Sequence, residues 1–132
     1  MRRPLDPRPL LHCIRAGGGA TFDHDGRPVD PGERWLYPLH PGKTLIVCPS
    51  ADWAAPLRRF VEEHRPLLEQ DHPEWRAFGA WIHPAGDLYL DIVTGRFDRE
   101  EARREALEAG QREGRPVVAL FQASSGRTLT LV

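Results

Sequence analysis

The sequence predicts a single α+β domain with a sheet-and-helix core. Residues 77–83 and 88–93 have the composition and alternation of two strands, separated by the turn residues 84–87. Residues 44–48 form a short, β-branched apolar run, and a helical pattern follows over 57–68. A second helix is predicted after Asp98, which has the features of an N-cap. Strands and helices therefore share one compact fold.

The N-terminal part of the chain is expected to be less regular. Residues 1–19 contain several prolines and end in three consecutive glycines, so we predict an irregular arm, with 10–14 as a short strand. Residues 20–132 form the predicted domain, which is long enough to bury a core of its own. Within it, 20–29 is predicted to be a hairpin around Asp25-Gly26. Because of Pro38, 35–39 is predicted to be an edge strand or an extended segment.

The two predicted helices differ in their signals. In 57–68 the apolar residues recur at three- and four-residue steps, and Pro66 should kink or end the helix. After Asp98, Glu101 stands at the capping-box position and Phe97 at the staple position. Ala102, Ala106 and Ala109 form a narrow stripe that would let this helix lie close to a sheet. Ion pairs are expected between Glu100 and Arg104 and between Glu108 and Arg112, and Gly114 ends the helix.

The order of these elements predicts a topology. From residue 44 it reads strand, helix, strand, strand, helix, strand, followed by one further strand over 128–132. This order is typical of the ferredoxin-like, or split βαβ, motif. We therefore expect a ferredoxin-like core, with the N-terminal hairpin and the last strand extending or covering its edges.

The charge balance and the cysteines limit the classes of function. The 18 basic and 19 acidic residues give a net charge of −1, so no overall field attracts nucleic acid or anionic lipid. Only Cys13 and Cys48 are cysteines, which favours free thiols in a reducing compartment. No apolar run follows the basic N-terminus, and no stretch is long enough to cross a bilayer. We expect a cytoplasmic protein without membrane contact.

No motif in the sequence indicates catalysis, a cofactor or a metal. Gly42-Lys43-Thr44 lacks the upstream glycine and the following helix of a phosphate-binding loop. No short Cys or His spacing indicates a metal site. Cys48 could act as a nucleophile only with a positioned base, and none is marked, so a small buried side chain is the favoured interpretation. A non-catalytic protein is therefore favoured.

Aromatic and charged residues outside the helices are the candidates for binding. Tyr89 and Asp91 share one face of the strand 88–93, which would be a solvent or ligand face. A separate group of aromatic residues outside the two predicted helices consists of Trp35, Tyr37, Trp75 and Trp81, and Arg34 and Arg76 are adjacent to two of them. Tryptophan, tyrosine and arginine are enriched where proteins bind partners. The predicted binding residues are Trp35, Tyr37, Trp75, Arg76, Tyr89, Asp91 and Arg96.

Several short segments also resemble a group of natural proteins. Gly79-Ala80-Trp81-Ile82, then 86–92, then Glu100-Glu101-Ala102 and Gly110-Gln111 are similar to segments of small proteins of unknown function from bacteriophages and mobile elements. Gly18-Gly19-Ala20-Thr21-Phe22 is similar to a segment near their start. The resemblance implies a phage-related accessory protein that binds host or defence components, and it implies no catalytic residues.

Three functions remain open at this stage. The first is a non-catalytic binding or regulatory protein with a host or defence macromolecule, most simply a protein, as its partner. The second is a small-molecule-binding protein or small enzyme with a pocket on the face that carries Tyr89 and Asp91. The third is a nucleic-acid binder that uses Arg34, Arg58, Arg59, Arg76 and the N-terminal arm. The near-neutral charge favours a protein over a nucleic acid.

Overall fold

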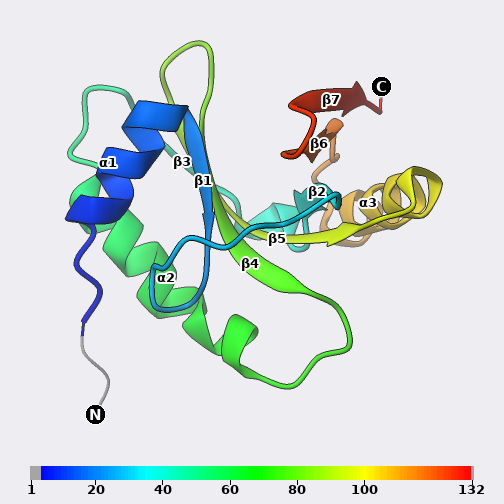
Figure 1. Ribbon diagram of the computed structural model, residues 1–132, viewed down its shortest axis with the longest axis horizontal. Helices are drawn as coiled ribbons and strands as arrows, with labels where there is room; N and C mark the ends of the chain where they lie inside the picture. Colours follow the sequence, from blue (N-terminus) through cyan, green and yellow to red (C-terminus); the bar gives the residue numbers. More distant parts are fainter. Residues whose placement is uncertain (1–3, 132) are drawn as a thin grey trace. The chain divides into compact units, whose positions relative to one another are not determined.

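The computed structural model describes residues 4–131, so the start of the predicted arm and the last residue of the predicted final strand lie outside it. The described chain is α+β, with three α-helices and a seven-stranded antiparallel sheet (Figure 1). The elements are α1 (Arg8–Gly17), β1 (Gly19–Phe22), β2 (Trp35–Pro38), the short 3-10 helix η1 (Pro41–Lys43), β3 (Leu45–Val47), α2 (Ala54–Glu69), β4 (Arg76–Ile82), β5 (Leu88–Arg96), α3 (Arg99–Glu113), β6 (Ala119–Gln122) and β7 (Arg127–Thr130). None of the described helices combines the length and apolar character needed to span a membrane.

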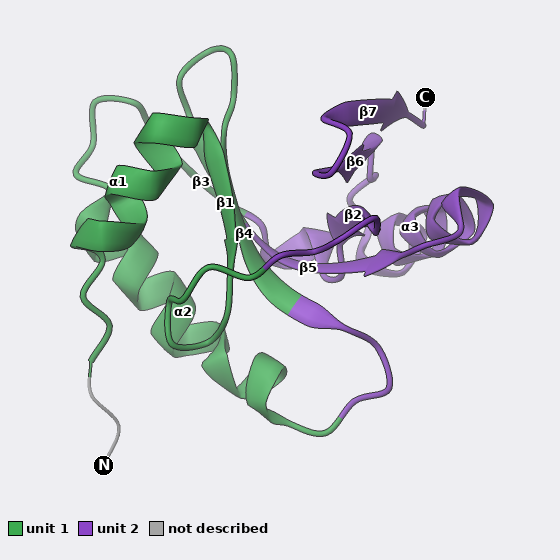
Figure 2. Ribbon diagram, viewed as in Figure 1, with its two compact units in different colours: residues 1–29, 45–71, 77–90 green, residues 30–44, 72–76, 91–132 purple. Residues whose placement is uncertain are grey.

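The chain divides into two compact units (Figure 2). The first contains residues 1–29, 45–71 and 77–90, and the second contains 30–44, 72–76 and 91–132. The strand β5 passes from one unit into the other after Leu90. Each unit has its own buried side chains, and we describe each separately.

The first unit buries aromatic and aliphatic side chains between its helices and strands. Phe22 of β1 is paired with Phe78 of β4, and their ring centroids lie 5.5 Å apart. Phe60 of α2 packs on Phe78 with ring centroids 5.9 Å apart, and Leu57 and Val61 of the same helix are fully buried. Because side chains alternate along β4, α2 covers the face of Phe78 and not the face of Trp81.

The second unit has a smaller core around β2 and α3. Trp35 and Tyr37 of β2 pack with Ala102 and Ala106 of α3, and Leu120 of β6 completes this core. The predicted alanine stripe is confirmed, because Ala102, Ala106 and Ala109 are each at least 98% buried. The Asp98 side chain accepts a hydrogen bond from the backbone N–H of Glu100 at 3.1 Å, and Gly114 ends α3 with φ = +70°. These small residues let α3 pack against β2.

The strand pairing reproduces only part of the predicted topology. β3 and β4 both neighbour β5, as the first three strands of a ferredoxin-like core would. However, β6 pairs with β2 and not with β3. β2 occupies the position beside β5 next to residues 93–96, whereas β3 pairs with residues 88–90. A ferredoxin-like order is therefore not clearly formed, because two different strands share the position of its first strand.

Several local predictions are wrong. Residues 8–17 form the helix α1 and not an irregular arm, because Leu10 and Ile14 are one helical turn apart and both are buried. β2 is not an edge strand, since it pairs with both β5 and β6. Pro38 is tolerated because it is the last residue of β2 and pairs only with Val93. Pro66 does not end the helix α2, which continues to Glu69, and the alternative prediction of a kink at Pro66 stays a prediction.

Other predicted contacts are formed in part or replaced by different ones. The predicted hairpin over 20–29 is formed in a short version, since Phe22 and Pro28 form an antiparallel bridge and the backbone N–H groups of Asp23 and Val29 donate to the carbonyls of Arg27 and Thr21, each at 2.9 Å. Phe97 is 64% exposed and lies under the guanidinium group of Arg34, so it is not buried on the first turn of α3. Glu101 is 3.5 Å from Arg96. Among the described residues, neither Glu100–Arg104 nor Glu108–Arg112 forms an ion pair.

Candidate functional site

The second unit contains a cavity of about 350 Å³ between β2 and α3, which we call the β2–α3 cavity. This volume is at the lower end of the range for small-molecule sites. Tyr37 and Ala109 form part of its wall. The charged and titratable residues that line it are His40, Glu74, Arg76, Arg96, Glu105 and Arg112. A wall this rich in charge is suited to a polar ligand and poorly suited to an apolar one.

Tyr37 contributes a buried polar group to this cavity. The residue is 3% exposed, and no described residue hydrogen-bonds its hydroxyl. No buried side-chain polar atom of the described residues lacks a hydrogen-bond partner, so the hydroxyl must be exposed to the cavity. Burial raises the pKa of Tyr37 to about 12. The hydroxyl therefore keeps its proton at neutral pH and can both donate and accept.

The arginines of the cavity are held in place by different partners. Nη2 of Arg76 is 2.6 Å from Oε1 of Glu74, and both side chains are largely buried. Burial alone would raise the pKa of Glu74, but its hydrogen bonds and the charges of Arg76 and His72 together lower it. Nη1 of Arg96 donates to Thr94 Oγ1 at 3.2 Å and to the Gly95 carbonyl at 3.1 Å. These bonds fix two guanidinium groups at the cavity wall.

His40 is fixed from the end of α3. Its Nδ1 lies 2.7 Å from Oε2 of Glu113, and the other carboxylate oxygen accepts the backbone N–H of Gly42 at 2.9 Å. Since a carboxylate only accepts hydrogen bonds when it is ionised, His40 Nδ1 carries the proton of this bond. Arg112 donates to the Leu39 carbonyl at 3.3 Å. The end of α3 thus supports the loop that closes one side of the cavity.

The first unit presents a second candidate site, an aromatic surface on the sheet. We call it the aromatic face and define it as Ile46, Trp81, His83 and Tyr89. Ile46 is directly paired with Tyr89. The ring centroids of Trp81, His83 and Tyr89 lie 5.4 to 5.6 Å from one another. Trp81 is nevertheless 50% exposed and Ile46 44% exposed.

The turn between β4 and β5 orients the aromatic face. The backbone N–H of Ala85 donates to His83 Nδ1 at 3.0 Å, so the other ring nitrogen, Nε2, carries the proton of the neutral imidazole. His83 and Asp87 close the turn with a backbone hydrogen bond of 2.8 Å, and Gly86 adopts φ = +101° within it. No described residue accepts from the Trp81 indole or pairs with the Tyr89 hydroxyl. The aromatic face therefore presents three hydrogen-bond donors.

The predicted binding residues are distributed over different environments. Tyr37, Arg76 and Arg96 come together in the β2–α3 cavity, and Tyr89 belongs to the aromatic face. Trp35 is 6% exposed and packs in the core of the second unit. Trp75 is half-buried, and the guanidinium of Arg34 lies 4.8 Å from its ring centroid. Neither Trp35 nor Trp75 lines the cavity.

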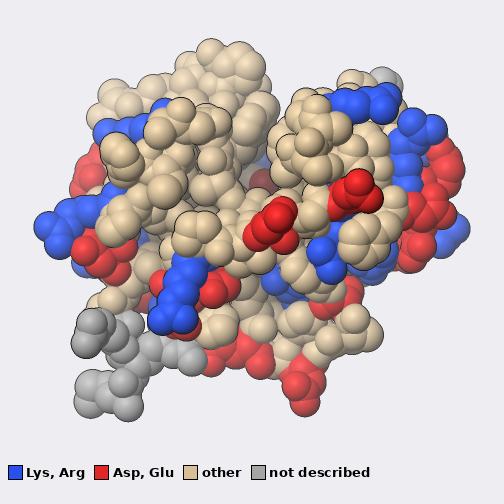
Figure 3. Space-filling view, viewed as in Figure 1, with Lys and Arg blue, Asp and Glu red and all other residues tan. Residues whose placement is uncertain are grey.

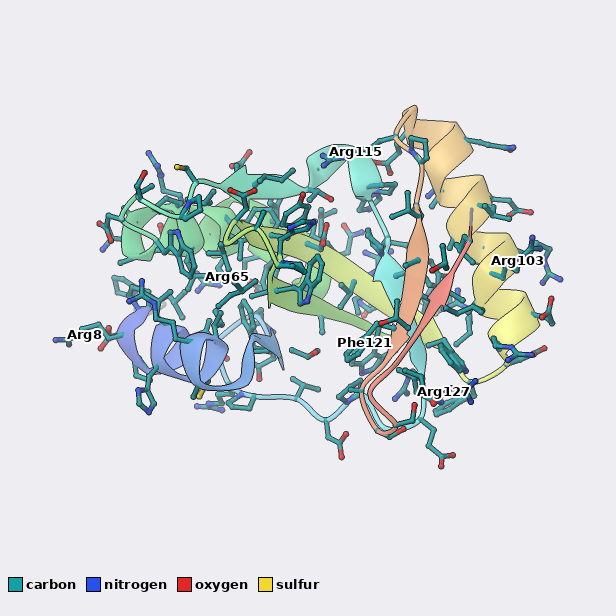
Figure 4. The ribbon with its side chains drawn as sticks, turned by 90° about the horizontal axis from the view of Figure 1, so that it is seen from above. Arg8, Arg65, Arg103, Arg115, Phe121 and Arg127 are labelled. Carbon is teal, nitrogen blue, oxygen red and sulfur yellow. The ribbon has the colours of Figure 1, made fainter. Side chains whose placement is uncertain are left out.

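The carboxylate of Asp91 interacts with other residues of the second unit. Thr44 donates its hydroxyl to the Asp91 carboxylate, and the Thr44 carbonyl accepts from Arg115, which lies beside η1 (Figure 4). Burial raises the pKa of Asp91, while the Thr44 hydrogen bond and the Arg115 charge oppose this to a smaller extent. Asp91 and Tyr89 do not line the β2–α3 cavity.

Sequence reasoning missed His40, Glu74, Glu105 and Arg112 in the cavity. Glu105 and Arg112 are seven residues apart, which places them on one face of a helix, but charged residues at such spacing usually face solvent. His83 belongs to no sequence motif, and only its contacts with Trp81 and Tyr89 give it a role. The prediction of a buried Cys48 is wrong, since both cysteines are exposed free thiols. A hydrogen bond from Ser50 lowers the pKa of the Cys48 thiol.

Within residues 4–131 no three metal-ligating side chains gather in one place. Comparison of the chain with models of protein families, with curated proteins and with solved structures finds no match.

Proposed function

We propose that this chain is a non-catalytic binding protein that contacts a protein partner through the aromatic face. The observation that carries the proposal is the exposure of Trp81 within a packed aromatic cluster. Trp81 is 50% exposed, whereas Trp35 and Trp53 are each only 6% exposed. Exposed tryptophan and tyrosine side chains are the residues that most often dominate the binding energy of protein interfaces.

The packing of the aromatic face would lower the entropy cost of binding. The three rings already contact one another edge-to-face or in a stack, and the hydrogen bond from Ala85 fixes the His83 ring. Immobilising a side chain at an interface costs about 0.5–1.5 kcal/mol, and part of this cost is already met in the free protein. A rigid aromatic surface can therefore bind tightly over a small area.

The chemistry of the aromatic face specifies the partner surface. Ile46 and the rings offer apolar contact area, and none of the four residues is an acid, an arginine or a lysine. Trp81, His83 and Tyr89 each offer a donor that no described residue uses. The matching partner is a protein surface on which backbone carbonyls or carboxylates surround an aliphatic side chain. The resemblance to phage accessory proteins points to a host protein for this role.

A nucleic-acid partner is less well supported. Arg34 stacks on Trp75 and Phe97, with centroid distances of 4.8 and 4.6 Å, and Arg76 is paired with Glu74. Acidic and basic side chains are interspersed over the surface seen in Figure 3. These arginines are therefore occupied by partners within the chain, and the surface in that view carries no extended basic stripe of the kind that follows a phosphate backbone.

Affinity capture with matched variants tests this function. The wild-type chain, Trp81→Ala and Ile46→Lys are used to capture proteins from a host lysate, and the captured protein is then purified and its affinity for each chain is measured. We expect Trp81→Ala to weaken this affinity by more than about tenfold, as expected for a residue that dominates an interface. The control is Val118→Ala, because Val118 is 57% exposed but belongs to the second unit.

Three results would count against this function. The first is a purified partner that binds Trp81→Ala and Ile46→Lys as tightly as it binds the wild type. The second is self-association of the chain that Trp81→Ala abolishes, which would make a second copy the occupant of the aromatic face. The third is salt-dependent retention on nucleic acid that is lost in Trp81→Ala. Circular dichroism of each variant checks that the fold is retained.

A further inference from the structure

The β2–α3 cavity carries an inference that is independent of the aromatic face. Its wall holds a largely buried tyrosine hydroxyl without a partner among the described residues, and such a group is normally satisfied by a ligand or by water. Arg76, whose side chain is 10% exposed, lines the same space. Buried polar groups that converge on a cavity are the usual mark of a small-molecule site.

The charges of the wall do not cancel at every position. Arg76 is neutralised by Glu74 at 2.6 Å, and Arg96 lies 3.5 Å from Glu101. Glu105 forms no ion pair with a described residue. Arg112 is 4.0 Å from Glu113, and that carboxylate already accepts hydrogen bonds from His40 and Gly42. One uncompensated carboxylate and one weakly compensated guanidinium therefore remain in the cavity wall.

These two charges lie at opposite ends of one helix face. Glu105, Ala109 and Arg112 follow one another at steps of four and three residues on α3, and all three line the cavity. With a rise of 1.5 Å per residue, Glu105 and Arg112 are separated by about 10 Å along the helix axis. Ala109 is small, so space remains between them.

Tyr37 lies near charges of both signs. The guanidinium of Arg96 lowers the pKa of its hydroxyl, and the carboxylates of Glu105, Glu101 and Glu74 raise it. Glu74 and Glu101 are paired with Arg76 and Arg96, so Glu105 is the carboxylate among them without an ion pair to a described residue. A positive group would be stabilised there by Glu105 and could donate to the Tyr37 oxygen. At the other end, the Arg112 guanidinium suits a carboxylate. A ligand with only a negative charge would be repelled by Glu105, and a ligand with only a positive charge would be repelled by Arg112.

We propose that the β2–α3 cavity binds a small zwitterion of about dipeptide length, with its ammonium group at Glu105 and Tyr37 and its carboxylate at Arg112. The length follows from the helix spacing, because two extended residues span about 7 Å and the side chains of Glu105 and Arg112 reach toward each other. The cavity volume of about 350 Å³ has room for a ligand of this size. The chemical class is a free amine and a free carboxylate on one short chain.

Titration with three related peptides tests this site in the wild-type protein. Alanyl-alanine is the zwitterion, N-acetyl-alanyl-alanine lacks the ammonium group, and alanyl-alanine amide lacks the carboxylate. Binding is followed by isothermal titration calorimetry and by amide chemical shifts. We expect alanyl-alanine to bind at least about tenfold more tightly than either capped form. Amide shifts should concentrate at residues 37–40 and 105–112.

Matched variants assign the two ends. Glu105→Gln should weaken the binding of alanyl-alanine by about tenfold or more, and this variant should no longer prefer alanyl-alanine over the acetylated peptide. Arg112→Gln should no longer prefer alanyl-alanine over its amide. Glu108→Gln and Arg103→Gln are the controls, because both residues lie on α3 outside the cavity lining and are exposed, with Arg103 directed away from the helix (Figure 4).

Certain outcomes would overturn the zwitterion site. They are equal binding of alanyl-alanine and a capped form, unchanged affinity in Glu105→Gln and Arg112→Gln, or the absence of any shift along residues 105–112 in the folded wild type. None of these results affects the test of the aromatic face, since Trp81→Ala and Ile46→Lys alter the first unit only.

Discussion

Glu113 Oε2 lies 2.7 Å from His40 Nδ1, and this hydrogen bond links the end of α3 to the loop that follows β2. The other oxygen of Glu113 accepts the backbone N–H of Gly42 at 2.9 Å, in the first turn of η1. One carboxylate thus satisfies two donors from a segment more than 70 residues away in the sequence. His40 lines the β2–α3 cavity, so this link also shapes the candidate site.

Replacement of Glu113 should therefore destabilise the protein. Glu113→Ala leaves the Gly42 N–H and the His40 ring without their acceptor, and we expect a loss of about 1–3 kcal/mol in the free energy of unfolding. Urea denaturation followed by circular dichroism measures it. Glu108→Ala is the control on the same helix, because Glu108 is exposed, and its effect should stay within about 0.5 kcal/mol. Equal effects of the two substitutions would mean that the link to His40 contributes nothing.

Gly110 permits the close approach of α3 to the chain that leads into β6. A Cβ at this position would lie 3.0 Å from the Val117 nitrogen, 3.1 Å from the Arg115 carbonyl oxygen and 3.2 Å from the Pro116 Cα. All three are backbone atoms, so the backbone of residues 115–117 would have to move. We expect Gly110→Ala to lower the free energy of unfolding by about 1–3 kcal/mol.

Gly17 provides the matched control for this prediction. It is the last residue of α1, and no atom lies within 4 Å of a Cβ built on it. Gly17→Ala should raise the stability by about 0.4–1 kcal/mol, because alanine restricts the unfolded chain more than glycine does. Chemical denaturation of both variants gives the comparison, and a stabilised Gly110→Ala protein would contradict the close approach.

Parts of this fold could be predicted because their causes are local. The Asp98 cap, the stripe of Ala102, Ala106 and Ala109, and the termination at Gly114 depend only on residues within one helix. The helix α1 could also have been found, because Pro7 and Pro9 lie at its start, where proline is tolerated, and Leu10 and Ile14 are one turn apart.

The pairing of strands and the candidate sites could not be predicted in the same way. Whether β6 pairs with β2 or with β3 depends on contacts between residues more than 80 positions apart, for example Trp35 with Gln122. Arg112 could equally have paired with Glu108 one turn earlier, but it donates to Leu39. Such choices depend on the whole fold, and neither a hydrophobic period nor a charge spacing records them.

Asp91 predicts a specific dependence of stability on pH. Burial raises its pKa in the folded protein, whereas an aspartate of the unfolded chain titrates near about 3.9. The folded state therefore holds the proton more tightly, and its stability falls as the pH rises from about 4 through the raised pKa of Asp91. Asp91→Asn cannot ionise and can still accept from Thr44, so at neutral pH it should be more stable than the wild type.

Denaturation midpoints at acidic and neutral pH test this prediction. The advantage of Asp91→Asn should shrink below about pH 4, where the aspartate of both the folded and the unfolded chain is protonated. Asp87→Asn is a control on the same strand hairpin that leaves the Asp91 carboxylate in place. A wild type that is more stable than Asp91→Asn at neutral pH would show that the Thr44 and Arg115 interactions outweigh burial.

Tyr37 should titrate at unusually high pH and limit the stability of the protein in alkali. Burial raises its pKa to about 12, whereas a tyrosine of the unfolded chain has a pKa near about 10. A raised pKa means that the stabilising contribution of the protonated phenol is complete below about pH 10 and is lost as the pH rises toward about 12. Two pKa units correspond to roughly 2–3 kcal/mol.

The absorbance of the phenolate measures this pKa. The chain has two tyrosines, so Tyr89→Phe leaves Tyr37 as the sole source of phenolate absorbance, and the midpoint of its titration gives the pKa directly. The stability of Tyr37→Phe should decline much less above pH 10 than that of the wild type. A Tyr37 midpoint near 10 in the folded Tyr89→Phe protein would contradict the prediction, because it would place the hydroxyl in open water and not in the β2–α3 cavity.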